Sequence, residues 1–259
     1  MTIRVGVDGS GPSRAALAWA AKRAASEGSA LELVHVVDGE WGQVGQQAID
    51  DETDAGTQVL AEAIEHARRY ASDVTTTLLH GSVAWELATA TTPGDLLVVG
   101  THTTGYLSGR ALGTRSIVVA SVARSSVAVI PDTPVTGRRG VVVGVASGTA
   151  WESAVTWGAS EAVRLGNELS LVHAAAAGDE GHALLADAAA LASGIHPALV
   201  IRRRVSRRRP SEALLDASRS AGLLVLGPTH ETTARAGFLG STTHEVLLNI
   251  NAPVVVARS

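Results

Sequence analysis

Short apolar runs alternate with amphipathic segments through the first half of the chain. The runs are rich in β-branched residues and end at turn residues, which predicts buried strands at residues 3–7, 31–37, 74–79, 95–99 and 126–130. Helical spacing of apolar residues between them predicts helices over residues 13–27 and 51–70, near residues 85–88, and from about residue 114. Ser13 is a candidate N-cap of the first helix, and Gly28 is a natural stop for it.

The order of these elements indicates the fold class. Five predicted strands alternate with four predicted helices. Strand–helix–strand units with short connections are right-handed in almost every known case, and their strands run parallel. The chain is therefore expected to form an α/β fold in which an open, doubly wound sheet carries helices on both faces.

The pattern starts again after a polar linker at residues 134–139. At an offset of 138 residues, identical residues recur throughout the first strand–helix–strand unit; His35, for example, meets His173. At the fourth strand Gly100 meets Gly227, so the offset has fallen to 127 and the second copy is shorter. A repeat of this length predicts two tandem domains, at residues 1–133 and 139–259, each with a five-stranded parallel sheet.

Each copy ends in an apolar strand, at residues 126–130 and 253–257. An apolar edge strand is prone to pair with another strand. We expect these two strands to pair with each other, so that the halves form a pseudo-dimer within one chain. Association into a homodimer is left open.

Composition narrows the class of protein. Apolar residues make up 46% of the chain and charged residues 18%, and cysteine is absent. Neither a membrane span nor a signal peptide is evident, so a cytoplasmic protein is expected. The net charge of −4 is unevenly divided: residues 1–137 carry nine Lys and Arg against fifteen Asp and Glu, and the remainder twelve against ten. The two halves are therefore not electrostatic copies.

One stretch that carries candidate chemistry occurs twice. Residues 98–116 read VVGTHTTGYLSGRALGTRS, and residues 225–243 read VLGPTHETTARAGFLGSTT. In each copy a buried strand ends on glycine, and thirteen residues later a Gly-Thr or Gly-Ser pair opens a helix. Backbone N–H groups and hydroxyls at such a helix start bind anions. The pattern indicates a phosphate site.

Several segments together resemble the universal stress protein family in its tandem two-domain form. They are VGVDGS, SRAALAWA, LELVHVV, GDLLVVGTH and SVAVIPD, in this order and spacing. The resemblance covers essentially the whole chain. It implies a stress-response protein that binds ATP, ADP or AMP as a regulatory or sensing module, with Mg²⁺ only if a triphosphate is bound.

The family's nucleotide-binding members carry G-x-x-G, nine residues and G-[ST], with an aspartate after the first strand. Carried over to the first copy, this pattern implies contacts from Asp8, Val36, Gly100, Thr103, Gly113, Thr114 and Ser116, where Thr103 occupies the position of the second glycine. In the second copy it implies contacts from Gly227, Gly240 and Ser241, while His230 and Ala146 replace the second glycine and the aspartate. The second copy is expected to bind nucleotide more weakly, or to bind a different anion.

Two other functions stay open. Slow ATP hydrolysis or phosphotransfer would use the same pocket, but the sequence offers no identifiable general base, Walker motif or G-x-S-x-G elbow. Alternatively, both pockets are vestigial and the protein is a structural or interaction module. His35 and His173 are expected to make structural hydrogen bonds rather than bind metal, and no metal site is predicted.

An arginine cluster occupies the third strand of the second copy and its exit. Its members are Arg202, Arg203, Arg204, Arg207, Arg208 and Arg209. Such a cluster can bind nucleic acid. However, the strand is expected at the sheet edge, where charges discourage pairing with other chains, and aromatic residues are absent from the cluster. Edge protection or an acidic partner surface is therefore favoured over nucleic acid.

Overall fold

The computed structural model describes residues 1–38, 46–101, 114–132, 137–148, 151–174, 180–228 and 239–258. The chain divides into two compact units, Met1–Asp132 and Thr133–Ser259. These are unit 1 and unit 2, respectively. Among the described residues, no helix has the length and apolar character needed to cross a membrane.

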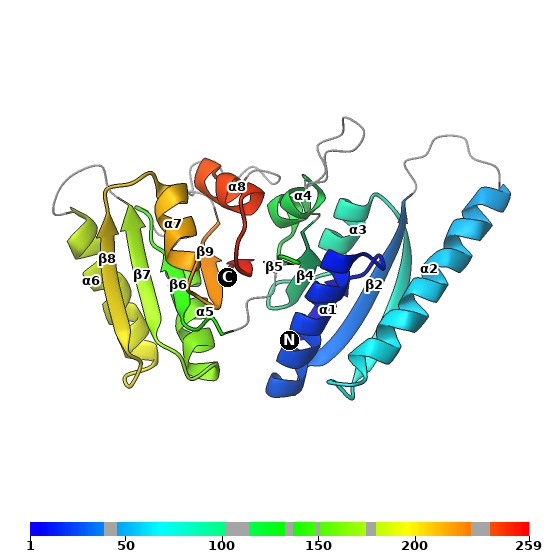
Figure 1. Cartoon of the computed structure of the whole chain (residues 1–259), viewed down its shortest axis with the longest axis horizontal. Helices are drawn as coiled ribbons and strands as arrows, with labels where there is room; N and C mark the ends of the chain where they lie inside the picture. Colours follow the sequence, from blue (N-terminus) through cyan, green and yellow to red (C-terminus); the bar gives the residue numbers. More distant parts are fainter. Residues whose placement is uncertain are drawn as a thin grey trace. The chain divides into compact units, whose positions relative to one another are not determined.

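Unit 1 alternates strands and helices as the hydrophobic pattern predicts (Figure 1). Its strands are β1 (Thr2–Gly6), β2 (Ala30–Asp38), β3 (Val74–Gly81), β4 (Leu96–Gly100) and β5 (Ser126–Ile130). Its helices are α1 (Gly11–Glu27), α2 (Gln46–Ala67), α3 (Val83–Thr89) and α4 (Thr114–Val122).

The strands of unit 1 form one parallel sheet in the order β3-β2-β1-β4-β5. Helices α1 and α2 pack on one face, and α3 and α4 pack together on the other. Because both faces are covered, β4 and β5 are buried along almost their whole length. The direction in which the chain adds strands reverses at β1, as in a doubly wound sheet.

Unit 2 repeats this arrangement. Its strands are β6 (Val141–Gly144), β7 (Leu169–Ala174), β8 (Ile201–Ser206), β9 (Leu223–Leu226) and β10 (Val254–Val256). Its helices are α5 (Trp151–Arg164), α6 (Glu180–Ile195), α7 (Pro210–Ser218) and α8 (Ser241–Leu248). The parallel order is β8-β7-β6-β9-β10, with α5 and α6 on one face and α7 packed with α8 on the other. The predicted fold class is confirmed for both units.

Two helix starts differ from the sequence prediction. Ser10, not Ser13, caps α1, because its side chain accepts a hydrogen bond from the N–H of Ser13 and Pro12 fits the first turn. Helix α2 begins at Gln46, five residues before the predicted start, since its first residues, QQAI, are mostly good helix formers but carry no apolar periodicity. Gly28 ends α1 in the left-handed conformation (φ 64°), as predicted.

The arginine cluster lies where the topology prediction puts it. Strand β8 pairs with β7 alone and forms an edge of the unit 2 sheet, with the side chains of Arg202, Arg203 and Arg204 exposed. Arg202 forms an ion pair with Glu168 at 2.8 Å, and Arg208 forms one with Asp216. These charges make the edge a poor template for pairing with another strand.

One glycine at the end of β4 determines how α1 begins. A Cβ at Gly100 would lie 2.4 Å from the carbonyl carbon of Pro12 and 2.8 Å from the nitrogen of Ser13. Both neighbours are backbone atoms of the first turn of α1, so neither can rotate away. The absence of a side chain at Gly100 therefore lets the start of α1 approach the end of β4, where the two flank the same crevice.

A charged cluster fixes the opposite end of the unit 1 sheet. Asp95 accepts hydrogen bonds from the N–H groups of Thr2 and Thr92, each at 3.0 Å, and from the guanidinium of Arg4 at 2.6 Å. Arg4 also contacts Glu32 on β2 at 2.7 Å, so the cluster joins β2, β1 and the start of β4. Burial alone would raise the pKa of Asp95, but these hydrogen bonds outweigh it and lower the pKa to about 2.

We expect Asp95→Asn to destabilise the protein at pH 7 by about 1–2 kcal/mol, because the four hydrogen bonds that this charged acceptor receives, one of them from the Thr92 hydroxyl, are weakened. A carboxylate whose folded pKa is depressed contributes stability above its unfolded pKa and loses it as pH falls toward the folded value. Urea unfolding should therefore show the gap between wild type and Asp95→Asn closing between about pH 4 and pH 2. A gap that stays constant over this range would contradict the assignment.

We expect Gly100→Ala to destabilise the protein by about 1–3 kcal/mol, the usual range for overpacking. The matched control is Gly194→Ala, since Gly194 lies in α6 and a Cβ there would meet no neighbouring atom within 4 Å. That control should be neutral or stabilising, because alanine favours a helix. Thermal unfolding followed by circular dichroism measures both. Equal melting temperatures for Gly100→Ala and wild type would disprove the close-approach role.

Candidate functional site

A cavity of about 250 Å³ lies beyond the carboxyl ends of β1 and β4 in unit 1. These are the strands between which the winding direction reverses, and doubly wound sheets bind ligands at that point. The cavity is lined by the turn after β1, the ends of β2 and β4, the first turn of α4, and residues of α2 and α3. Asp8, Val36, Gly100 and Ser116 line it together, although they lie far apart in sequence.

Asp8 belongs to a hydrogen-bonded turn between β1 and α1. Its Oδ1 accepts a hydrogen bond from the N–H of Ser10 at 2.9 Å, and its own N–H donates to Oγ of Ser13 at 3.1 Å. Gly9 takes a positive φ of 75°, which the turn requires. Asp8 therefore both forms the turn and lines the cavity, because the hydrogen bonds of the turn fix its carboxylate at the mouth of the cavity.

Val36 presents backbone groups to this cavity. The register between β1 and β2 ends at the pair Gly6 and Val34, and the N–H of Val7 donates to the carbonyl of Val34 at 2.9 Å. Backbone groups two residues apart in a strand point to the same side. The N–H and C=O of Val36 therefore point toward the space that β1 has left, where a flat polar ligand edge can pair with them.

The first turn of α4 supplies the anion-facing side. Ser116 is 8% exposed, lines the cavity, and makes no side-chain hydrogen bond within the described part of the chain. The first N–H groups of a helix have no intrahelical partner, so this turn also offers backbone donors. Thr103 and Gly113 lie outside the described residues, as does the side chain of Thr114.

An ion pair crosses the mouth of the cavity. Arg115, in the first turn of α4, contacts Asp38 at the end of β2 at 2.9 Å, and both line the cavity. A cation in the first turn of a helix opposes the helix dipole, so this position favours an anion beside it. The Arg115 side chain is 59% exposed and can turn toward a ligand without breaking a buried contact.

The described lining of this cavity is acidic. Asp8, Asp38 and Glu52 face it, whereas Arg115 is the single cation among the described lining residues. A highly charged anion would meet repulsion here unless a cation accompanied it. In the described part of the chain, no three His, Asp or Glu side chains are arranged to hold a metal ion.

The two histidines on the second strand of each unit make the same contact. Nδ1 of His35 is 2.7 Å from the carbonyl oxygen of Val7, and Nδ1 of His173 is 2.7 Å from that of Val145. Because a carbonyl only accepts, Nδ1 carries the proton in both rings. These bonds hold the turns after β1 and β6, and they confirm the predicted structural role of both histidines.

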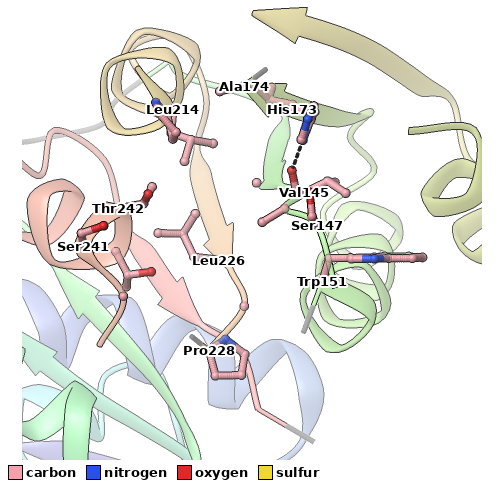
Figure 2. Close-up of a pocket in the computed structure, with 17 residues that line it drawn as sticks. Val145, Ser147, Trp151, His173, Ala174, Leu214, Leu226, Pro228, Ser241 and Thr242 are labelled. Carbon is pink, nitrogen blue, oxygen red and sulfur yellow. Dashed lines mark hydrogen bonds between the residues drawn. The ribbon is translucent and has the colours of Figure 1, made fainter. Parts of the chain in front are cut away.

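Unit 2 has a cavity at the equivalent place, of about 430 Å³ (Figure 2). Gly227, Gly240 and Ser241 all line it, so the structure brings the second set of predicted residues together. Gly240 is the N-cap of α8 and Ser241 its first residue. Ala146 occupies the position of Asp8, as the alignment of the two copies indicates, and it also lines the cavity.

Sequence reasoning missed three charged residues of the unit 1 site. The sequence places Glu52 at an acidic helix start with no visible connection to the pocket, and the pairing of Asp38 with Arg115 spans 77 residues. Local pattern cannot reveal such a pairing. One signal was available: an arginine between two hydroxyl residues at a helix start is electrostatically unfavourable and suggests an anionic neighbour.

Comparison with known proteins places this geometry in a family. The model of the Universal stress protein family matches residues 1–131 and 175–258. A universal stress protein of Mycobacterium tuberculosis is 30% identical over 99% of this chain and 94% of its own length. One from Mycolicibacterium smegmatis is 29% identical over 99% and 96%.

A solved structure agrees with these matches at the level of the fold. The crystal structure of a universal stress protein from Archaeoglobus fulgidus covers 99% of this chain and 98% of its own, with a TM-score of 0.78 and 18% identity. Both units therefore lie within the compared length. The chain belongs to the universal stress protein family.

Proposed function

We propose that this chain is a regulatory or sensing module that binds an adenine nucleotide (ATP, ADP or AMP), mainly in unit 1. One observation carries the proposal: backbone groups suited to a base edge, a carboxylate and a helix start surround a single cavity at the point where the sheet reverses. These are the three kinds of contact that a nucleotide needs for its base, ribose and phosphate.

The adenosine end would lie between β1 and β2. The N–H and C=O of Val36 can pair with the donor and acceptor edge of adenine. The Asp8 carboxylate can accept from ribose hydroxyls, because its two oxygens offer about four acceptor positions. Local bonds already order Asp8, so binding would not have to fix this side chain.

The phosphate end would lie at the first turn of α4. Its unpaired N–H groups, the Ser116 hydroxyl and the Arg115 guanidinium are the donors on this side. Gly100 shapes the cavity, because the absence of a side chain lets the start of α1 pack closely against the end of β4. The family pattern adds Thr103, Gly113 and Thr114, whose contacts stay predictions.

The acidic lining bears on which nucleotide is favoured. With three carboxylates and one arginine around the described cavity, AMP or ADP is a better electrostatic match than free ATP. ATP would bind as its Mg²⁺ complex, with the metal held by the phosphates. In unit 2, Gly227, Gly240 and Ser241 keep the anion-facing half of the site, but Ala146 lacks the carboxylate, so unit 2 is proposed to bind nucleotide more weakly or to bind a different anion.

Several other properties expected from the sequence stay predictions. They are the cytoplasmic location, the domain boundaries at residues 133 and 139, the pairing of the closing strands, a homodimer and the absence of a nucleic-acid role.

Turnover of ATP by the full chain, measured as released phosphate, would separate a slow enzyme from a binding module.

Asp8→Asn should weaken AMP binding about tenfold or more, because a charged acceptor for the ribose hydroxyls is lost. Isothermal titration calorimetry measures it. The matched control is Asp51→Asn, an exposed carboxylate on α2 outside the cavity, and its AMP affinity should equal that of wild type. No heat with wild type, or equal affinity for wild type and Asp8→Asn, would refute the proposal.

Arg115→Met should weaken AMP binding by about three- to tenfold but leave adenosine binding unchanged or slightly improved, since only AMP carries the phosphate that the guanidinium would pair with. Arg68→Met, at an exposed position just beyond α2, serves as the control. The loss should shrink as salt is raised. If adenosine and AMP lost affinity equally, Arg115 would act by supporting the fold and not by contacting phosphate.

A further inference from the structure

The cavities of the two units are built from equivalent elements but differ in chemistry at most polar positions. Every charged group of the described unit 1 lining is missing from the described unit 2 lining. Ala146 replaces Asp8, Trp151 replaces Ser13 and Thr242 replaces Arg115. No described residue of the unit 2 lining is Asp, Glu, Lys or Arg.

Apolar side chains form the walls of the unit 2 cavity. Figure 2 shows Leu214 and Leu226 between the first turn of α8, which carries Ser241 and Thr242, and the strand end that carries Val145. The indole of Trp151 points away from Leu226. The unit 2 cavity has a larger volume than that of unit 1, at about 430 against 250 Å³. Its apolar walls suit an apolar ligand group.

Hydrogen-bond donors gather at one end of this apolar space. The first bond within α8 runs from the N–H of His244 to the carbonyl of Gly240 at 2.9 Å, which leaves the N–H groups of residues 241–243 without a helical partner. Thr243 is 7% exposed and lines the cavity, and its hydroxyl makes no hydrogen bond within the described ranges. A ligand or water in the cavity can therefore satisfy this hydroxyl.

The first turn of α8 can stabilise only a small negative charge on a ligand. The start of a helix is equivalent to roughly half a positive charge, which suits one negative charge and not several. The described lining offers no lysine or arginine to neutralise a phosphate dianion or a triphosphate. Because alanine occupies position 146, unit 2 also lacks the carboxylate that Asp8 would offer to ribose hydroxyls in unit 1. An anion with a single charge and an apolar body fits both constraints.

We propose that the cavity of unit 2 binds a small monocarboxylate whose body is apolar, such as an aryl or branched aliphatic acid. The carboxylate accepts hydrogen bonds from the first turn of α8 and from the Thr243 hydroxyl, and the body packs against Leu214, Leu226 and Val145. This inference does not depend on nucleotide binding in unit 1, because the two cavities share no residue.

The test uses the full chain labelled with ¹⁵N and titrated with 2-naphthoate, methyl 2-naphthoate and AMP. We expect 2-naphthoate to shift the amide signals of Ala146 and of residues 240–243. The ester has the same body without the charge and should bind at least about tenfold more weakly, because a charge-assisted hydrogen bond is lost. AMP should leave these signals unchanged, whether or not it shifts those of Asp8 and Val36.

Variants distinguish a built site from nonspecific adhesion. Thr243→Val keeps the shape of the side chain and removes its hydroxyl, so the dissociation constant for 2-naphthoate should rise about three- to tenfold. Ser116→Ala alters the equivalent position of unit 1 and should not change it. Ala146→Leu projects into the cavity from an exposed position and should abolish binding without unfolding the protein, even if Thr243→Val folds poorly.

Three outcomes would overturn the proposal. They are the absence of shifts at residues 240–243 with 2-naphthoate, equal affinities for the acid and its ester, and stronger binding of AMP than of 2-naphthoate in unit 2. A failure of AMP to bind anywhere would count against the proposed function of unit 1 and leave this proposal standing.

Discussion

The reversal of winding at the first strand of each unit, β1 in unit 1 and β6 in unit 2, is the constraint on which the two sites depend. Parallel strands require right-handed crossovers, so the chain places α1 on one face of the sheet and α4 on the other. The turn after β1 and the start of α4 then meet across a crevice that no crossover can cover. Gly100 lets the start of α1 close up against the end of β4, and the charged cluster around Asp95 fixes the opposite end of the same strands. The functional groups lie where the scaffold has to leave space.

In the two proposed sites the same scaffold supports different chemistries, because the features that shape the crevice are duplicated while the charged groups that line it are not. The histidine bond to the turn carbonyl occurs in both units, as do the strand order and the hydroxyl near the helix start. Carboxylates and arginine line the unit 1 cavity, whereas alanine and threonine occupy the positions of Asp8 and Arg115 in unit 2. Fold therefore constrains where a ligand binds, and side chains at a few positions determine what it is.

The sequence predicted what is local or periodic. Apolar periodicity located the strands, repeat spacing exposed the duplication, and the glycine that ends each fourth strand located the crevice. It did not reveal contacts between distant segments: the Arg115 to Asp38 pair, Glu52 at the cavity, and the role of Gly100 against Pro12 all depend on tertiary packing. The apolar nature of the second cavity was also missed, since Leu214 and Leu226 have the same pattern as ordinary core residues.

The central claim is that one chain holds two cavities with different ligand chemistry. Native mass spectrometry of the full chain, with AMP and 2-naphthoate present together, tests this claim most directly. We expect a complex that contains one AMP and one 2-naphthoate, with AMP lost in Asp8→Asn and 2-naphthoate lost in Ala146→Leu. Two AMP molecules bound to one chain, or displacement of AMP by 2-naphthoate, would contradict it.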